Sequence, residues 1–395
     1  MKRMLSGIWV KKVLAMVILL TLTGMAGLFA IDIKLIPPKL RRNNPFASEI
    51  QDQIDSAFLL YENELRSSIG DMDADPQELI GAFATSSVFS STGASLRSYQ
   101  GYNTFALTVG AVGGIQFPLN IFSLVGNVGN IEREMDKLVD KINSDGDLQV
   151  GLNPQLLNAQ VGLNTGFLLK GLYLGLKGGY LNFPFDLDEL QGSFQTWSAG
   201  ALANYQIIPQ FRIIGGIILW RGLNVGAGFV YQSTSLNLKV PLEAEDGGDM
   251  TFSIYENEYG RLYGELKDPS LTLGFNINTY TIPLEAVTSI RLLSFFNASF
   301  GVGADLGFGS ASLKGGLDGG VNIEGYQSLG LGLEIESQGG FSVSLGGENS
   351  PNLFNPKIMG SIGFTAGPAI VLDIPITYYF LNNGFNFGIS LGIAL

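Results

Sequence analysis

The side chains that carry most enzyme and metal chemistry are missing from this sequence. The chain has no histidine and no cysteine. A Ser-His-Asp site and a histidine-ligated zinc, iron or copper site are therefore excluded. Disulfides and lipid attachment through an N-terminal cysteine are excluded as well. Carboxylate pairs, lysine and tyrosine remain as catalytic groups, but no motif arranges them. We predict that the protein is not an enzyme and holds no cofactor.

A short acidic run has part of the pattern of a metal site. Asp71, Asp73 and Asp75 alternate like the first ligands of a calcium-binding loop. The sixth position of such a loop needs glycine for its sharp turn, and here that position is Pro76. We interpret the run as a solvated loop that caps the following helix, and we predict no metal site.

Three charged residues occur inside segments that otherwise alternate between apolar and small residues: Lys177, Asp305 and Asp373. By their parity, all three should face away from the apolar side of their strands. In a barrel that other side is the lumen, where charged residues tune the selectivity for ions or solutes. The alternative is that each one belongs to a structural ion pair or is a solvated wall residue. We take the three as lumen-facing candidate site residues.

The position of these residues depends on a strand pattern that recurs along most of the chain. In residues 385–395, every odd-numbered residue is large and apolar, and every even-numbered residue is small or polar. A period of two places the two sets on opposite faces of a strand. Large apolar residues on one face and small or polar ones on the other suit a wall between lipid and a polar lumen.

Similar runs begin near Tyr102, and we count roughly 12 to 14 of them, each near the ~9–11 residues that a tilted strand needs to cross a membrane. Asn383-Gly384, before the last run, is a strong hairpin signal because both positions tolerate positive φ. We predict an all-β fold, a transmembrane antiparallel β-barrel formed by residues 101–395. The lumen of such a barrel is wider than its own side chains fill, so something passes through it or plugs it.

The first 30 residues should be set aside before any reasoning about the fold. They have a basic start, followed by an apolar run from Val13 to Met25. This order is typical of a signal peptide, which we expect to be cut after Ala30.

Residues 31–100 have helical spacing in place of alternation. Ser48 and Gln51 form a capping box at the start of one helix, and Pro76 stands at the first position of a second, shorter one. Two interpretations remain open for this segment. It is either a plug that enters the lumen or a periplasmic lead-in that packs on the rim.

A further amphipathic helix is expected within the barrel sequence, over residues 131–142. Ile131, Met135 and Leu138 share one of its faces. Because it lies between two strands, it should sit in a loop at one rim, or else fold into the mouth and narrow it.

The charge of the chain limits its partners. Without residues 1–30, the chain has 19 basic and 35 acidic residues and a net charge of −16. An acidic protein is a poor partner for nucleic acid. The partners that we expect are the lipid bilayer and either small solutes or external proteins.

The glycine-rich alternating strands, together with the terminal hairpin from Asp373–Phe380 into Gly388–Gly392, resemble spirochaete-type outer-membrane β-barrel proteins. Some relatives of that kind are described as surface adhesins, and others as transporters for long-chain fatty acids. The resemblance implies a place in the outer membrane and insertion by the barrel-assembly machinery through the C-terminal strand. The chain departs from the usual insertion signal, which ends in an aromatic residue, because it ends in Leu395.

We therefore expect an outer-membrane channel or transporter for small or hydrophobic solutes that is gated by an N-terminal plug. The alternative is a surface-exposed barrel adhesin whose loops bind external proteins. The two differ in whether the lumen or the loops carry the function.

Overall fold

The structure is a computed structural model, and it describes residues 32–41, 45–70, 76–91, 102–116, 151–187, 190–215, 217–241, 250–257, 260–324, 335–366 and 369–395. This part of the chain contains a 14-stranded sheet, a two-stranded sheet and two helices. The signal peptide expected at 1–30 and the helix expected at 131–142 lie outside it.

Ten strands of the large sheet close into a ring, because β11 pairs with β14 along one edge and with β10 along the other. All pairings around the ring are antiparallel. The ring strands, in order, are β11 (Phe296–Glu324), β14 (Phe354–Ala366), β15 (Ile370–Tyr379), β16 (Gly384–Ala394), β3 (Phe105–Gln116), β4 (Gly151–Asn164), β5 (Leu172–Leu187), β6 (Leu190–Ile208), β8 (Ile218–Pro241) and β10 (Gly260–Leu292).

The predicted antiparallel β-barrel is therefore confirmed. The barrel was expected to have roughly 12 to 14 strands; the ring has ten, and the whole sheet, with the strands outside the ring, has 14. Three of the remaining strands lie beyond the ring at one end, and the fourth lies at the other end.

The two faces of the ring differ in chemistry, as a period of two requires. The outer face carries exposed large apolar side chains, among them Val109, Val161, Leu176, Phe229, Phe300, Ile362, Ile376 and Ile389. The inner face carries buried polar side chains, among them Thr108, Asn153, Gln155, Thr196, Gln232, Thr279 and Asn386. This arrangement is the reverse of a soluble protein and is that of a transmembrane barrel.

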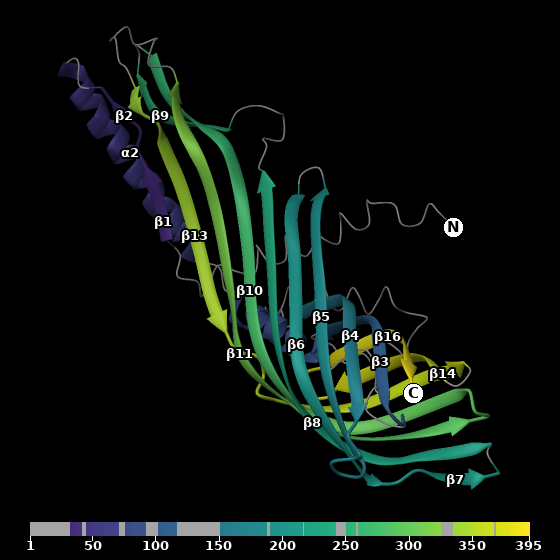
Figure 1. Cartoon of the computed structure of the whole chain (residues 1–395). Coiled ribbons are helices and arrows are strands. Elements are labelled where there is room, and N and C mark those ends of the chain that lie inside the picture. Colours follow the sequence, from purple (N-terminus) through teal and green to yellow (C-terminus); the bar gives the residue numbers. More distant parts are fainter. Residues whose placement is uncertain are drawn as a thin grey trace, which may run out of the picture.

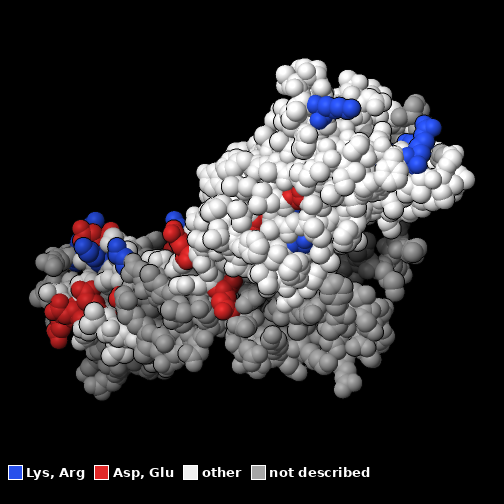
Figure 2. Space-filling model, turned by 90° about the horizontal axis from the view of Figure 1, so that it is seen from below, with Lys and Arg blue, Asp and Glu red and all other residues white. Residues whose placement is uncertain are grey.

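Charge follows the same division. Strands β3, β4, β6, β14, β15 and β16 contain only two charged residues between them, Lys357 and Asp373, and both are buried. Figure 2 shows a broad surface with few red or blue residues over the barrel, whereas red and blue residues gather at the left, the end that carries α2. The outer wall of the ring is therefore almost free of charge.

The two ends of the ring differ in their connections. One end, the turn rim, has tight turns at 165–171 and 293–295, and it also holds the C-terminal Leu395. The other end, the loop rim, has the hairpin at 380–383, where Asn383 has a positive φ of 47°. Gly384 has no positive φ and already belongs to β16, so the turn is longer than the two-residue turn that the Asn-Gly signal predicts. At the loop rim, β3 ends at Gln116 and β4 begins at Gly151, with 34 residues between them in the sequence.

Strands on one side of the ring continue past the loop rim as an open sheet, which we call the extension (Figure 1). The centre of the extension is the hairpin of the long strands β10 and β11. Their pairing runs from Leu292 with Phe296, next to the turn, to Tyr263 with Glu324 at the far end. Strand β9 (Met250–Asn257) adds to the far part of β10, while β13 (Gly339–Asn349) pairs with β11 and β1 (Asp32–Ile36) pairs with β13. β7 (Phe211–Ile214) lies at the opposite end, paired with β8.

Helix α2 (Pro45–Gly70) packs against the extension and not against the ring (Figure 1). Its apolar stripe of Ile50, Ile54 and Phe58 is buried, as the helical spacing predicts. The side chain of Gln51 accepts a bond from Leu40 N and donates one to Pro38 O, which ties the helix to β2 (Lys39–Leu40). The short strands β1 and β2, and the pairing of β2 with β12 (Ile335–Ser337), were not predicted.

No helix among the described residues is long and apolar enough to span a bilayer.

Candidate functional site

Helix α3 (Pro76–Ser90) lies at the mouth of the ring, inside the wall, where it contacts β3, β4, β8, β10, β11, β13 and β16. Pro76 at its first position and Glu78 in its first turn favour the start of a helix there. The rest of its sequence is dominated by small residues, and side chains from Leu79 to Ser91 are buried or half-buried. A helix with little side-chain volume suits a narrow lumen.

The first half of α3 is held by apolar packing. Leu79, Ile80 and Ala84 form one cluster with inward-facing residues of the tall side of the barrel, Leu238, Leu273, Phe275, Ile277, Ala311 and Leu313. The ring of Phe83 lies 4.9 Å from that of Phe275, centroid to centroid. This cluster fixes the helix against β8, β10 and β11, the strands that continue into the extension.

The second half of α3 is held by hydrogen bonds to the polar wall. Ser87 Oγ lies 2.9 Å from Thr279 Oγ1, and Ser90 Oγ lies 2.8 Å from Gln232 Nε2, which donates to it. Asn386 Nδ2 donates to the carbonyl of Phe89. The hydroxyls of Thr85 and Ser86 bond to carbonyls of the helix itself, so only part of the polar surface of α3 is committed to the wall.

Behind these contacts, the inner wall forms its own network. Gln232 connects Gln155 to Asn153, which donates to Thr234 at 2.9 Å. Thr234 in turn lies 2.8 Å from Thr196. These bonds join strands β4, β6 and β8 to one another.

Two wall glycines allow the helix to approach. A Cβ at Gly114 would lie 2.3 Å from the carbonyl oxygen of Ser86, and a Cβ at Gly151 would lie 2.2 Å from that of Ala82. Any larger residue at either position would collide with the backbone of α3. The helix and the wall are therefore matched in shape.

Next to the end of α3, a group of charged side chains crosses the lumen face of β10, β11 and β14. Lys357 Nζ lies 2.7 Å from Asp305 Oδ1 and 2.5 Å from Glu285 Oε1. Tyr379 donates to Asp305 Oδ2 at 2.7 Å, and its ring stacks on that of Phe89 with 3.9 Å between centroids. Through Tyr379, this lumen charge cluster (Glu285, Asp305, Lys357 and Tyr379) contacts the helix.

The three residues singled out in the sequence are all buried on the inner side of their strands. Asp305 belongs to the lumen charge cluster. Lys177 lies within electrostatic range of Glu285, Asp305 and Lys357, but its ammonium has no hydrogen-bond partner among the described residues. Asp373 lies on β15, the strand of Tyr379, six residues before that tyrosine. That any of them acts on a solute stays a prediction.

Sequence reasoning missed Glu285, Lys357 and Tyr379. Lys357 sits between the apolar neighbours Pro356 and Ile358, and its parity could have identified it. Glu285 lies in a strand whose alternation is interrupted by Pro283, and a tyrosine near a strand end is usual in a girdle of interfacial aromatic residues. Nothing in the sequence indicates that the three meet.

Among the described residues, no group of three or more acidic side chains could hold a metal ion. The acidic run at Asp71, Asp73 and Asp75 lies outside these residues, so the expectation that it holds no metal stays a prediction. The expectations of no catalysis and no cofactor are likewise left as predictions.

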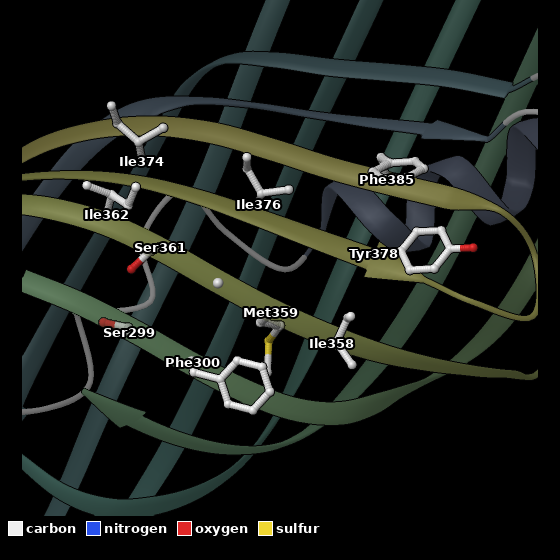
Figure 3. A pocket seen from close by; sticks show the side chains of 11 residues that line it. Ser299, Phe300, Ile358, Met359, Ser361, Ile362, Ile374, Ile376, Tyr378 and Phe385 are labelled. Carbon is white, nitrogen blue, oxygen red and sulfur yellow. The ribbon is translucent and has the colours of Figure 1, made fainter. Parts of the chain in front are cut away.

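A hollow also lies on the outer wall of the ring (Figure 3). It has a volume of about 620 Å³ and surrounds Gly360. Its outward lining is apolar: Phe300, Ile358, Ile362, Ile374 and Ile376. Because glycine leaves a gap among these exposed side chains, the hollow is part of the apolar band and not of the lumen.

The chain belongs to the Lsa36-like family, whose model matches residues 42–395. Comparison with curated proteins gives no match. The resemblance to spirochaete-type barrels is not tested by the family match and stays a prediction.

Solved outer-membrane barrels match the chain with low similarity. The translocator domain of the autotransporter NalP from Neisseria meningitidis is 10% identical, with 73% of this chain and 86% of that one covered and a TM-score of 0.28. The CymD monoaromatic hydrocarbon channel is 11% identical (80% and 98% covered, TM-score 0.25). The attachment protein Ail of Yersinia pestis is 9% identical (74% and 98% covered, TM-score 0.22).

Proposed function

We propose that this protein is an outer-membrane β-barrel that passes small solutes through its lumen, and that α3 is the gate. The observation that carries the proposal is a polar, charged inner wall that meets one slender helix at the mouth. A barrel that served only as an anchor would need neither buried charges nor a helix matched to its lumen.

The outer wall supports a place in the membrane. Exposing its large apolar side chains to water would be costly, whereas contact with lipid is favourable. The near absence of exposed charge also suits a wall that faces lipid. Because the mature chain is exported by the expected signal peptide, the outer membrane is the membrane in which such a barrel belongs. The lipid bilayer is then the first partner of the protein.

The inner wall supports passage of polar solutes. Several buried side chains on it have polar atoms without a hydrogen-bond partner, among them Gln160, Lys177, Ser289, Ser299, Ser361 and Ser390. An unsatisfied buried polar group costs about 1–3 kcal/mol, so groups of this kind normally hold water. A hydrated lumen with charges of both signs favours small polar solutes over apolar ones, which narrows the expectation of small or hydrophobic solutes.

The contacts of α3 suit a gate better than a fixed part of the wall. Apart from the bond of Gln232 to Ser90, the wall network joins β4, β6 and β8 through its own side chains, so we expect the barrel to stay closed when the helix moves. Ser87 and Ser90 connect the helix to the wall by hydrogen bonds, which are worth only about 0.5–1.5 kcal/mol each. Moving α3 away from β4 and β16 would open the mouth.

A disulfide lock tests this proposal, because the chain has no cysteine of its own. The double variant Ser87→Cys with Thr279→Cys places two thiols where two hydroxyls lie 2.9 Å apart. We expect single-channel conductance of the refolded protein to be absent when the pair is oxidised and to appear when it is reduced.

The matched control is Thr196→Cys with Thr234→Cys, which joins two wall strands at a similar hydroxyl distance of 2.8 Å and does not touch α3. Oxidation of the control pair should leave conductance unchanged. Equal conductance of the α3 pair in both redox states, or none in either state of a folded and inserted protein, would contradict gating by α3.

The extension favours a second function, binding of external proteins. It stands beyond the ring with α2 on it and carries exposed charges, including Lys34, Lys39, Asp52 and Asp55. Loops and appendages of a barrel are where binding specificity is found. Charge reversal at Asp52 and Asp55 should weaken capture of an external protein ligand without changing conductance, whereas an unchanged capture would count against the extension as the binding surface.

A further inference from the structure

The contacts of α3 along the wall show in which direction the helix runs. Near its start, the carbonyl of Gln77 accepts a bond from Asn349, at the end of β13 in the extension. In its middle, Thr85 Oγ1 accepts one from Asn352 N, and near its end Phe89 stacks on Tyr379. On β11, Asn349 is level with Ala311, whereas Lys357, the register partner of Tyr379, is level with Gly303. The helix therefore runs from the extension toward the turn rim.

The next described residues are already at the turn rim. Asn164 Nδ2 donates to the carbonyl of Tyr102, and the ring of Tyr102 meets that of Tyr173 at 5.1 Å. Asn103 N and Thr104 N both donate to the carbonyl of Leu395. Burial raises the pKa of the Tyr102 phenol, which keeps it uncharged against the rim. Ser91 and Tyr102 thus lie inside a closed ring at different heights.

The residues before and after α3 are consequently on opposite sides of the ring. Helix α2 and β1 belong to the extension, beyond the loop rim, whereas β3 begins at the turn rim. The ten strands close without a gap in their pairing, so Ser91 and Tyr102, which are both buried on the inner side, lie within one ring.

The lengths of the connections between strands indicate which rim of the ring faces the exterior. In outer-membrane barrels the short turns face the periplasm and the long connections face the exterior. Here the turns at 165–171 and 293–295 are at the turn rim, whereas the loop rim has the connection of 34 residues between Gln116 and Gly151 besides the short hairpin at 380–383. The loop rim and the extension therefore face the exterior.

We propose that the barrel displays its own N-terminal segment: residues 32–70, with β1 and α2, are carried through the lumen to the exterior and stay tethered there by α3. An exported chain starts in the periplasm, so a segment found beyond the loop rim has crossed the membrane layer. This role is separate from gating, since α3 can hold the displayed segment whether or not solutes pass.

Cysteine labelling on cells that express the full chain tests the proposal. Ser56→Cys places a thiol on the exposed face of α2, and Lys170→Cys places one in the exposed turn at the turn rim. We expect a membrane-impermeant maleimide to label Ser56→Cys fully on intact cells. Lys170→Cys should be labelled only after the outer membrane is permeabilised.

Protection of Ser56→Cys until permeabilisation would overturn the proposal, whatever the result for Lys170→Cys. Labelling of both thiols on intact cells would also overturn it, because the two would then lie on one side. If Ser56→Cys fails to fold, Asp55→Cys reports from the same exposed face. Neither outcome depends on conductance, so display and gating can fail separately.

Discussion

Strand β11 passes through both the ring and the extension, and its outer face changes character on the way. In the ring, its outward positions are apolar and exposed: Phe300, Val302 and Phe308. In the extension, Lys314 and Asp318 occupy the same parity and are also exposed. The outer face of this one strand is therefore in contact with lipid in the ring and with water in the extension. The change from apolar to charged outward residues between Phe308 and Lys314 indicates the position of the boundary.

The inner face of the same strand does not follow this change. Asp305 is buried in the ring and paired with Lys357, whereas Ala311 and Leu313, in the extension, are buried under α3. In the ring, charge is inside and apolar surface is outside, and in the extension the order is reversed. The comparison predicts that one type of substitution will have opposite effects in the two regions.

The largest effect should come from breaking the buried charges of the ring. Lys357→Met leaves Asp305 and Glu285 without their cation, and removing one partner of a buried ion pair costs about 3–5 kcal/mol. Lys314→Met, on the exposed face of the extension, should stay within about 0.5 kcal/mol of the parent. Urea unfolding of the refolded protein in vesicles measures both, and equal midpoints for the two variants would remove the distinction.

The second effect concerns the outer face. Phe300→Lys puts a charge into the apolar band and should cost about 2–4 kcal/mol if it lies near the middle of the bilayer. Asp318→Lys also adds a lysine to β11, but on the side that faces water, and should be nearly neutral. A neutral Phe300→Lys in the same urea experiment would mean that the ring wall does not face lipid.

A smaller effect is expected where the helix meets the wall. Ser87→Ala removes the bond to Thr279 and, at about 0.5–1.5 kcal/mol, should raise the open probability of the channel roughly two- to tenfold. Ser56→Ala is the control, because this hydroxyl bonds only to the backbone of α2. An unchanged open probability in single-channel recordings would show that Ser87 does not hold the gate.

The smallest effect should be on selectivity. Lys177→Met removes a cation from the lumen wall and should shift permeability toward cations, whereas Asp373→Asn should shift it toward anions. The reversal potential across a salt gradient measures the direction of each change. Shifts in the same direction would indicate that the two residues do not line the conducting path.

The period of two predicted the wall well because each residue's face follows from its own neighbours. The outer and inner positions of β16 need no knowledge of other strands. Closure of the ring depends instead on pairs such as Phe387 and Gly113, which no local pattern records. For the same reason a count of runs gives the strands of the whole sheet and not the ten that close.

The candidate site was predicted less completely, for a related reason. The helical spacing predicted α3, but its place at the mouth depends on Gly114 and Gly151, which mean nothing until a helix lies against them. Asp305 was found by parity, whereas its partners come from two other strands. Periodicity identifies which residues face the lumen, and only the register of the strands decides which of them meet.

The long hairpin of β10 and β11, whose register shifts once between Lys267 and Ser270, also determines how the molecule bears force. A pull on the extension along its strands would be carried down this hairpin into the ring. Hydrogen bonds of an antiparallel pair lie across the strands, so such a pull loads many of them at once, in shear, instead of opening them one after another. An appendage joined to its anchor in this way resists detachment.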